Sequence, residues 1–254
     1  MSEAISLLNE LLSSFGVDIT TAVALLTRLS GFFLFMPGIA ESVVPVRMKV
    51  LLAVALTGLL LPLTEPVADV KQGGLAALLG VEAFVGIALG FTVRAMIFAL
   101  SFTGAIIAQA LSLGQVFGVD TMGDSASAVS NGLTLAATTL LLTAGFDVTI
   151  LAVFAEQLET IPLGSASLDT GLEAEQATML ARGAIAFGVR LALPFLVLNF
   201  AFYLLMGFLN RAMPQLMVTF VGLPAITLGG LALFMLTVSS MLAAWLLRYP
   251  EVLP

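Results

Sequence analysis

Cysteine and histidine are both absent from this chain of 254 residues, and charged residues make up only 10% of it. Without these two residue types the chain has no disulfides, thiolate nucleophiles or imidazole bases, and it lacks most zinc, haem and iron–sulfur ligand sets. A soluble globular chain is typically about a quarter charged, because it must present a wetted surface. Since 60% of the residues are hydrophobic, we expect lipid or partner subunits to cover this chain.

Basic residues are scarce as well, 9 against 16 acidic ones, and the net charge is −7. No basic cluster exists that could neutralise phosphates, so we expect no nucleic-acid partner. The sequence contains no Walker phosphate loop, no HExxH motif and no GxSxG motif, and a Ser–His–Asp triad is impossible without histidine. We therefore expect no enzyme activity, no cofactor and no metal. The N-terminal residues are acidic, not basic, so we expect no cleavable signal peptide.

Six apolar blocks follow a short amphipathic stretch at residues 2–15. A helical membrane span takes about 20 apolar residues, so the sequence predicts an all-α, polytopic membrane protein with about six blocks, some broken or re-entrant. The blocks are Ile19–Met36, Val50–Leu63, Leu75–Phe117, Val129–Phe154, Ala181–Leu209 and Met217–Leu247.

Three of the blocks carry residues that interrupt a straight span. The third block is too long for one span, and we expect it to bend or turn back near Gly104 or Gly114. The fourth is broken by Gly145 and Asp147, and Pro194 is expected to kink the fifth.

The longest polar segment between blocks is Glu156–Gln176, which is acidic and contains no lysine or arginine. With six spans, the cations on the two sides tie: Arg47, Lys49 and Arg211 against Lys71, Arg182 and Arg248. The positive-inside rule counts cations and therefore does not decide. We expect the short loops that contain Arg47 and Arg211 to be cytoplasmic.

Five charged residues lie inside the apolar blocks: Arg28, Glu82, Arg94, Asp147 and Arg190. Each would cost about 2.5–3.5 kcal/mol at the centre of a lipid-exposed span. We therefore predict that this set lines a water path or meets partner subunits. The alternative is that some of them reach the interface or pair within the fold. The pairs Gly86/Gly90 and Gly114/Gly118 have the four-residue spacing that lets helices approach closely.

The stretch from Leu111 to Asn131 is rich in glycine and serine but also carries bulky apolar side chains. It is either an exposed loop or a re-entrant segment, since irregular backbone at membrane depth must be buried in protein or line a cavity. In the second case its apolar side chains could seal a pore, because hydrophobic constrictions gate by dewetting. A stand-alone secondary transporter or channel is the alternative to a gate, although no internal repeat supports it.

Several stretches, taken in order, resemble the FliR family of flagellar biosynthetic export-gate proteins, whose injectisome relatives are the T-type export-apparatus subunits. The matching residues are Pro37-Gly38 with Val44-Pro45-Val46-Arg47; Glu82, Gly86, Gly90-Phe91, Arg94, Gly104, Gln109 and Gly114; and Ala192-Leu193-Pro194, Asn199, Gly207, Asn210 to Leu216, Phe220, Gly222 and Pro224. Two positions depart from the pattern. Val119-Asp120-Thr121 replaces a frequent Asp-Pro, and Gly145-Phe146-Asp147 replaces a frequent Gly-His.

The resemblance implies a subunit of the type III secretion export gate in the bacterial inner membrane, at the flagellar basal body. Its implied partners are the P-type and Q-type membrane subunits, the B-type switch protein, the A-type export protein and unfolded exported flagellar proteins. It implies one export-gate membrane domain over residues 1–254, with a Q-like helical hairpin from about residue 181. The implied pore plug comprises Leu111, Leu113, Gly114, Val116, Phe117, Gly118 and Met122. The implied cytoplasmic hairpin tip comprises Arg211, Pro214 and Gln215.

Overall fold

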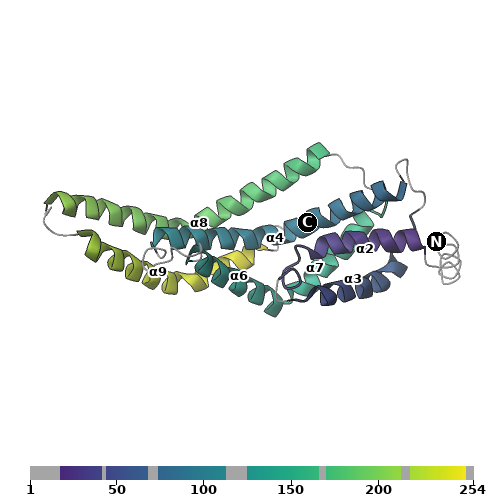
Figure 1. Ribbon diagram of the computed structural model, residues 1–254, viewed down its shortest axis with the longest axis horizontal. Helices are drawn as coiled ribbons and strands as arrows, with labels where there is room; N and C mark the ends of the chain where they lie inside the picture. Colours follow the sequence, from purple (N-terminus) through teal and green to yellow (C-terminus); the bar gives the residue numbers. More distant parts are fainter. Residues whose placement is uncertain are drawn as a thin grey trace. The chain divides into compact units, whose positions relative to one another are not determined.

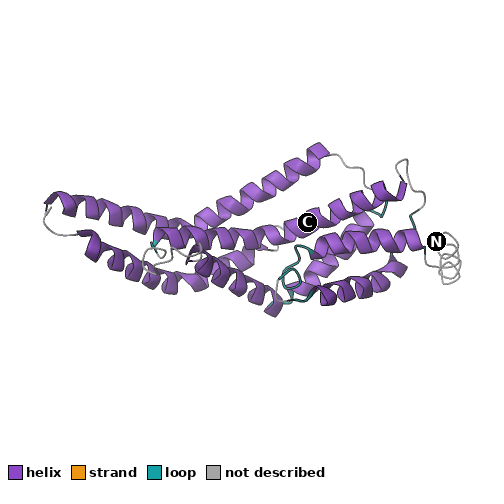
Figure 2. Cartoon of the chain, in the orientation of Figure 1, coloured by secondary structure: helices purple, strands orange, loops and turns teal. Residues whose placement is uncertain are grey.

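The computed structural model describes residues 18–41, 44–67, 74–112, 125–165, 170–212 and 218–249. All regular elements in these ranges are helices (Figures 1 and 2). The predicted all-α class is therefore confirmed. In chain order the elements are α2 (Ile19–Phe33), α3 (Val46–Leu60), the 3-10 turn η1 (Leu61–Leu63), α4 (Gly74–Ala110), α6 (Ser125–Thr143), α7 (Phe146–Thr160), α8 (Thr170–Ala212) and α9 (Val218–Arg248).

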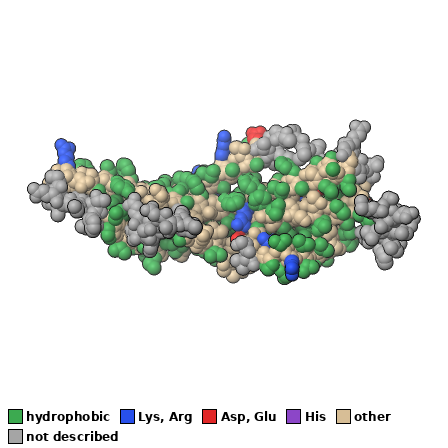
Figure 3. Space-filling model, in the orientation of Figure 1, with side chains coloured by type: hydrophobic (Ala, Val, Ile, Leu, Met, Phe, Trp, Pro, Cys, Tyr) green, Lys and Arg blue, Asp and Glu red, His purple; other side chains and the backbone are tan. Residues whose placement is uncertain are grey.

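Four of the described helices are long and apolar enough to cross a membrane, and a fifth is added if α6 and α7 count as one broken span. The four are α3 with η1, α4, α8 and α9. Each of the six expected apolar blocks contains at least one described helix, but α2 has only 15 residues, fewer than the about 20 that a membrane-crossing helix takes. Hydrophobic side chains cover much of the described surface in the view of Figure 3.

Helix α4 is continuous for 37 residues and ends at Ala110, so of the two expected positions Gly104 does not interrupt the helix. A Cβ at Gly104 would lie 2.6 Å from the Cα of Ser130 in α6. The glycine therefore serves close helix packing and does not break the helix. The other expected position, Gly114, lies outside the described residues.

The predicted break of the fourth block is confirmed at Gly145, which has a left-handed φ of 74° between α6 and α7. Asp147 does not break the chain but lies in the first turn of α7, where the helix dipole favours a negative charge. Helix α8 passes through Pro194 without interruption. The polar segment 156–176 is largely helical, since α7 runs to Thr160 and α8 begins at Thr170.

The chain divides into two compact units. Unit 1 contains the described residues up to Arg94 together with Ala144–Thr178. Unit 2 contains Ala95–Thr143 and the described residues from Met179 onward.

In unit 1, α2 packs against α3 and lies against the first part of α4. Asp18 begins α2, because its carboxylate accepts the backbone N–H groups of Thr20 and Thr21. A Cβ at Gly86 would overlap the carbonyl oxygen of Arg28, and one at Gly90 would lie 2.6 Å from that of Phe32. The predicted close packing at Gly86/Gly90 is therefore confirmed. The ring of Phe32 lies 5.0 Å from that of Phe154 in α7.

In unit 2, α8 and α9 run antiparallel beside the second part of α4. Gly222 of α9 lies against Phe202 and Met206 of α8, and Phe234 of α9 lies 6.1 Å from Phe195 of α8 between ring centroids. The order of these contacts is reversed along the two helices, which gives the antiparallel direction. The core cluster comprises Ile107, Ala108, Ala110, Leu111, Ala192, Phe195 and Met241.

Candidate functional site

A fully buried ion pair joins α2 to α4 in unit 1. The Nε atom of Arg28 donates to Oε2 of Glu82 at 2.5 Å, and both side chains are 0% exposed. Burying two charges costs several kcal/mol per ion unless the remaining donors and acceptors are satisfied too. The pair is therefore expected to have further partners, and it does.

Those partners are backbone groups in the turn that follows α7. Arg28 Nη1 donates to the carbonyl oxygen of Ile161 at 2.6 Å, and Glu82 Oε1 accepts the N–H of Gly164 at 2.8 Å. Gly164 has a left-handed φ of 76°, which disfavours a residue with a Cβ. Arg28 Nη2 is buried without a hydrogen-bond partner among the described residues. The pair thus fixes α2, α4 and this turn to one another.

A second ion pair in unit 1 holds the segment between α2 and α3. Arg94 Nη1 lies 3.0 Å from Oε1 of Glu41, with 16% and 30% of the two side chains exposed. Lys49 Nζ donates to the carbonyl oxygens of Ala40 and Glu41, each at 3.1 Å. Arg94 therefore pairs within the fold, which is one of the two alternatives for the charged set.

The other two members of that set, Asp147 and Arg190, are exposed on this chain. The chain's own fold does not bury these two side chains. Their predicted contact with partners remains a prediction.

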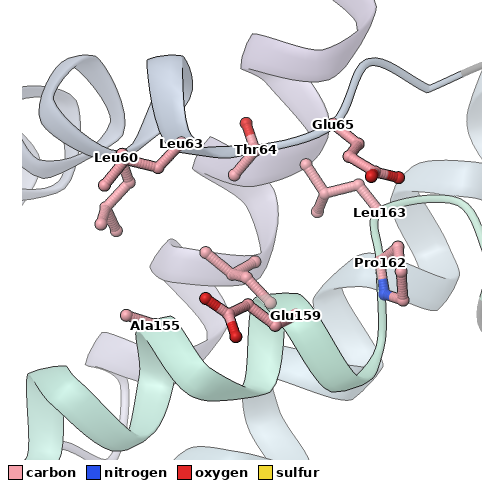
Figure 4. A pocket seen from close by; sticks show the side chains of 9 residues that line it. Leu60, Leu63, Thr64, Glu65, Ala155, Glu159, Pro162 and Leu163 are labelled. Carbon is pink, nitrogen blue, oxygen red and sulfur yellow. The ribbon is translucent and has the colours of Figure 1, made fainter.

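A cavity of about 350 Å³ lies in unit 1 between the end of α3 and α7. Its lining includes the apolar residues Leu60, Leu63 and Leu163 and the acidic residues Glu65 and Glu159. Figure 4 shows the Glu159 carboxylate on the side of Ala155, whereas that of Glu65 lies on the side of Leu163. The described residues contain no group of three or more metal-binding side chains.

The end of α4 is held against α9 in unit 2. Leu111, the first residue after α4, is 1% exposed, and its carbonyl oxygen lies 3.0 Å from the hydroxyl of Thr227. Its side chain lies directly on Gly230, where a Cβ would overlap Leu111 Cδ2. Ser112, the next residue, has a left-handed φ of 52°. Leu111 is therefore a core residue at the point where the chain leaves α4.

The remaining expected plug residues, Leu113, Gly114, Val116, Phe117, Gly118 and Met122, lie outside the described residues, as do Pro214 and Gln215 of the expected hairpin tip. Arg211 is exposed in the last turn of α8. A cation there interacts favourably with the C-terminal end of the helix dipole.

Sequence reasoning missed the pairing of Arg28 with Glu82 and the contact of Leu111 with α9. A signal for the first existed: Gly86 follows Glu82 by one helical turn, and it is at Gly86 that α2 approaches most closely. No signal identified the second, because Gly229 and Gly230 are indistinguishable in the sequence. Only the packing separates them, since a Cβ at Gly229 would meet no atom within 4 Å.

Apolar helices of membrane-crossing length, two of them only 11% buried and one 17% buried in their most apolar windows, define a polytopic helical membrane protein. The model of the family "Bacterial export proteins, family 1" matches residues 19–249, and the chain belongs to this family. The resemblance to FliR is confirmed. The flagellar biosynthetic protein FliR of Caulobacter vibrioides is 26% identical over 241 residues, which cover 93% of this chain and 95% of that protein. FliR of Escherichia coli K12 is 29% identical over 202 residues, 78% of this chain and 76% of that protein.

Proposed function

We propose that this chain is a subunit of the flagellar type III secretion export gate, and that it forms part of the protein-conducting channel and its plug. In this role it resides in the bacterial inner membrane at the flagellar basal body. It assembles with the P-type and Q-type membrane subunits, and it works with the B-type switch protein and the A-type export protein on unfolded flagellar substrates. It contributes no catalysis.

The main observation behind the proposal is that the rest of the chain buries only a small part of helices α8 and α9. In the most apolar windows of these two helices, 11% and 17% of the residues are buried. Large exposed apolar surfaces mark contact with lipid or with another protein. Family membership favours partner subunits as a large part of that cover.

Arg190 favours protein over lipid for one face of α8. It is exposed between the ends of the candidate span Ala177–Ala212, and the exposed side chains of Leu193 and Val197 follow it by one and two helical turns. A cation on such a face would cost about 2.5–3.5 kcal/mol at the bilayer centre. A partner helix that supplies a carboxylate or a carbonyl oxygen removes this cost.

The plug is assigned to the segment from about Leu111 to Met122, as the family resemblance implies. Its bulky side chains, Leu113, Val116 and Phe117 among them, suit a hydrophobic seal. Deleting Leu113–Gly118 is expected to leave assembly intact and to make the membrane permeable to ions and small solutes. An assembled deletion variant with wild-type permeability would remove the plug role.

The subunit role itself is tested by native mass spectrometry after detergent extraction, with the chain produced alone and together with its chromosomal neighbours. A discrete complex with small hydrophobic partners is the expected result. A homogeneous monomer or homodimer that the neighbours do not change would contradict the proposal. Such a result would favour a stand-alone transporter, and transport assays would follow.

A further inference from the structure

Three structural features meet at Leu111 and Ser112, where the end of α4 contacts α9. The Thr227 hydroxyl lies 3.0 Å from the Leu111 carbonyl oxygen. The Leu111 side chain fills the space above Gly230. Ser112 then takes a left-handed conformation. We call Leu111, Thr227 and Gly230 the α4 anchor.

The hydrogen bond in the α4 anchor has a specific physical role. The last carbonyl groups of a helix have no partner inside the helix, and Leu111 follows the last helical residue of α4, Ala110. Thr227 of α9 supplies a donor for the Leu111 carbonyl. Its single proton is shared with the Leu223 carbonyl oxygen at 2.9 Å, so the bond is made in competition with the hydroxyl's own helix.

The glycine in the α4 anchor is equally specific. Gly230 is buried against Leu111, whereas its neighbour Gly229 is exposed and has no atom within 4 Å of where a Cβ would lie. The two glycines are neighbours in one helix, yet the Leu111 side chain packs against Gly230 and not against Gly229. The fit at Gly230 is therefore a contact between α4 and α9 and not a general feature of this glycine pair.

We propose that the α4 anchor positions the start of the pore plug, and that Leu111 belongs to this anchor and not to the plug itself. The proposal rests on the plug function proposed above. Leu111 is packed in the core cluster with Ala192 and Phe195 of α8, so it cannot enter a channel without leaving that core. The anchor instead fixes the place and direction in which the chain departs toward Leu113.

The first test measures ion leak and assembly in cells that produce the complete gate. Gly230→Val adds three carbons where Leu111 lies, and we expect an assembled gate with leak approaching that of the Leu113–Gly118 deletion. Gly229→Val is the matched control and should behave like the wild type. Leu111→Ala removes three carbons, so the double variant Leu111→Ala/Gly230→Val should leak less than Gly230→Val, because volume-conserving exchanges are tolerated best.

Thr227 provides a second variant pair in case Gly230→Val does not assemble. Thr227→Val keeps the shape but removes the donor, and a lost hydrogen bond of about 1 kcal/mol corresponds to roughly a fivefold larger open population and leak. Thr227→Ser keeps the donor and should stay near the wild-type leak. Wild-type leak in assembled Gly230→Val, or equal leak in the two Thr227 variants, would overturn the anchor role.

The native chain has no cysteine, which allows a direct test of the contact that does not depend on leak. Leu111 Cγ lies 2.9 Å from the position of a Cβ at residue 230, so the two Cβ atoms are at most about 4.5 Å apart, within the range of disulfide-bonded cysteines. Leu111→Cys/Gly230→Cys should form a disulfide in the assembled gate on mild oxidation, and Leu111→Cys/Gly229→Cys should form far less.

The outcomes separate the two proposals. No disulfide in the assembled gate would refute the anchor and leave the plug unaffected. If the deletion variant increases ion leak but Gly230→Val and Thr227→Val keep the wild-type leak, the anchor is refuted and the plug is not. A silent deletion variant would refute the plug, and with it the role of the anchor, even where the disulfide forms.

Discussion

The two units of this protein hold their helices together by different chemistry. In unit 1 a fully buried arginine and glutamate bind each other and two backbone groups near the end of α7. In unit 2 four hydrogen bonds between segments far apart in the sequence run from neutral donors to backbone carbonyls: Thr103 to Gly188, Ser130 to Ser101, Thr227 to Leu111, and the Trp245 indole N–H to Met96.

The difference teaches which part of the chain is easier to rearrange. Removing one partner of a buried ion pair costs about 3–5 kcal/mol, because a charge is left behind in an apolar interior. Removing one neutral hydrogen bond costs about 0.5–1.5 kcal/mol. Breaking the ion pair in unit 1 is therefore expected to cost more than breaking one of these neutral contacts in unit 2.

The largest expected effect is at the ion pair. Arg28→Met or Glu82→Met alone should lower the stability of the purified gate by about 3–5 kcal/mol. The double variant should recover a large part of this loss, since a matched apolar pair leaves no unpaired charge, although Ile161 and Gly164 lose their partners. Thermal unfolding in detergent and the amount of protein in membranes measure both effects. A double variant as unstable as the worse single one would show that the backbone contacts matter more than the charges.

The next effect is at the closest approach of α2 and α4. Gly86→Ala places a Cβ on the carbonyl oxygen of Arg28, and because a backbone atom cannot rotate away we expect a loss of about 1–3 kcal/mol. Gly80→Ala on the same helix is the control, since a Cβ there meets nothing within 4 Å. The control should be neutral or slightly stabilising, because alanine favours a helix over glycine by about 0.5–1 kcal/mol. Equal thermal shifts in both variants would mean that the helices can separate freely at Gly86.

Composition and hydropathy predicted the helical membrane class and most of the helices, because long apolar runs have few other stable conformations in a chain with so little charge. The same signals misjudged where helices end. From the sequence, Gly104 is expected to interrupt the helix. In the structure the helix continues through Gly104, and the missing side chain leaves space for the backbone of Ser130. The polar residues after Glu156 look like a loop, although glutamate is a good helix former and α7 and α8 both extend into them.

For the candidate site, the sequence predicted only which charged residues would be energetically unfavourable in lipid. Charges inside apolar blocks identified Arg28 and Glu82, since each must find a partner. Arg28 and Glu82 are 54 residues apart in the chain, and their pairing depends on how α2 packs against α4. Residue spacing within one helix cannot predict such a pairing. Leu111 shows the converse: its apolar character fits a plug and a core equally well, and only its contact with Gly230 distinguishes them.

The smallest effect tests the neutral chemistry of unit 2 directly. The Thr103 hydroxyl lies 3.0 Å from the Gly188 carbonyl oxygen and 2.8 Å from that of Ala99. Thr103→Val keeps the shape and removes the donor, but Gly188 is inside α8, so its carbonyl keeps a helical partner. The expected loss is therefore only about 0.6 kcal/mol, the average for such bonds between membrane helices. Thr103→Ser controls for the hydroxyl, and thermal unfolding of the purified gate measures both. A loss near 3 kcal/mol in the valine variant alone would mean that a neutral contact fixes unit 2 as firmly as the ion pair fixes unit 1, and the contrast between the units would fail.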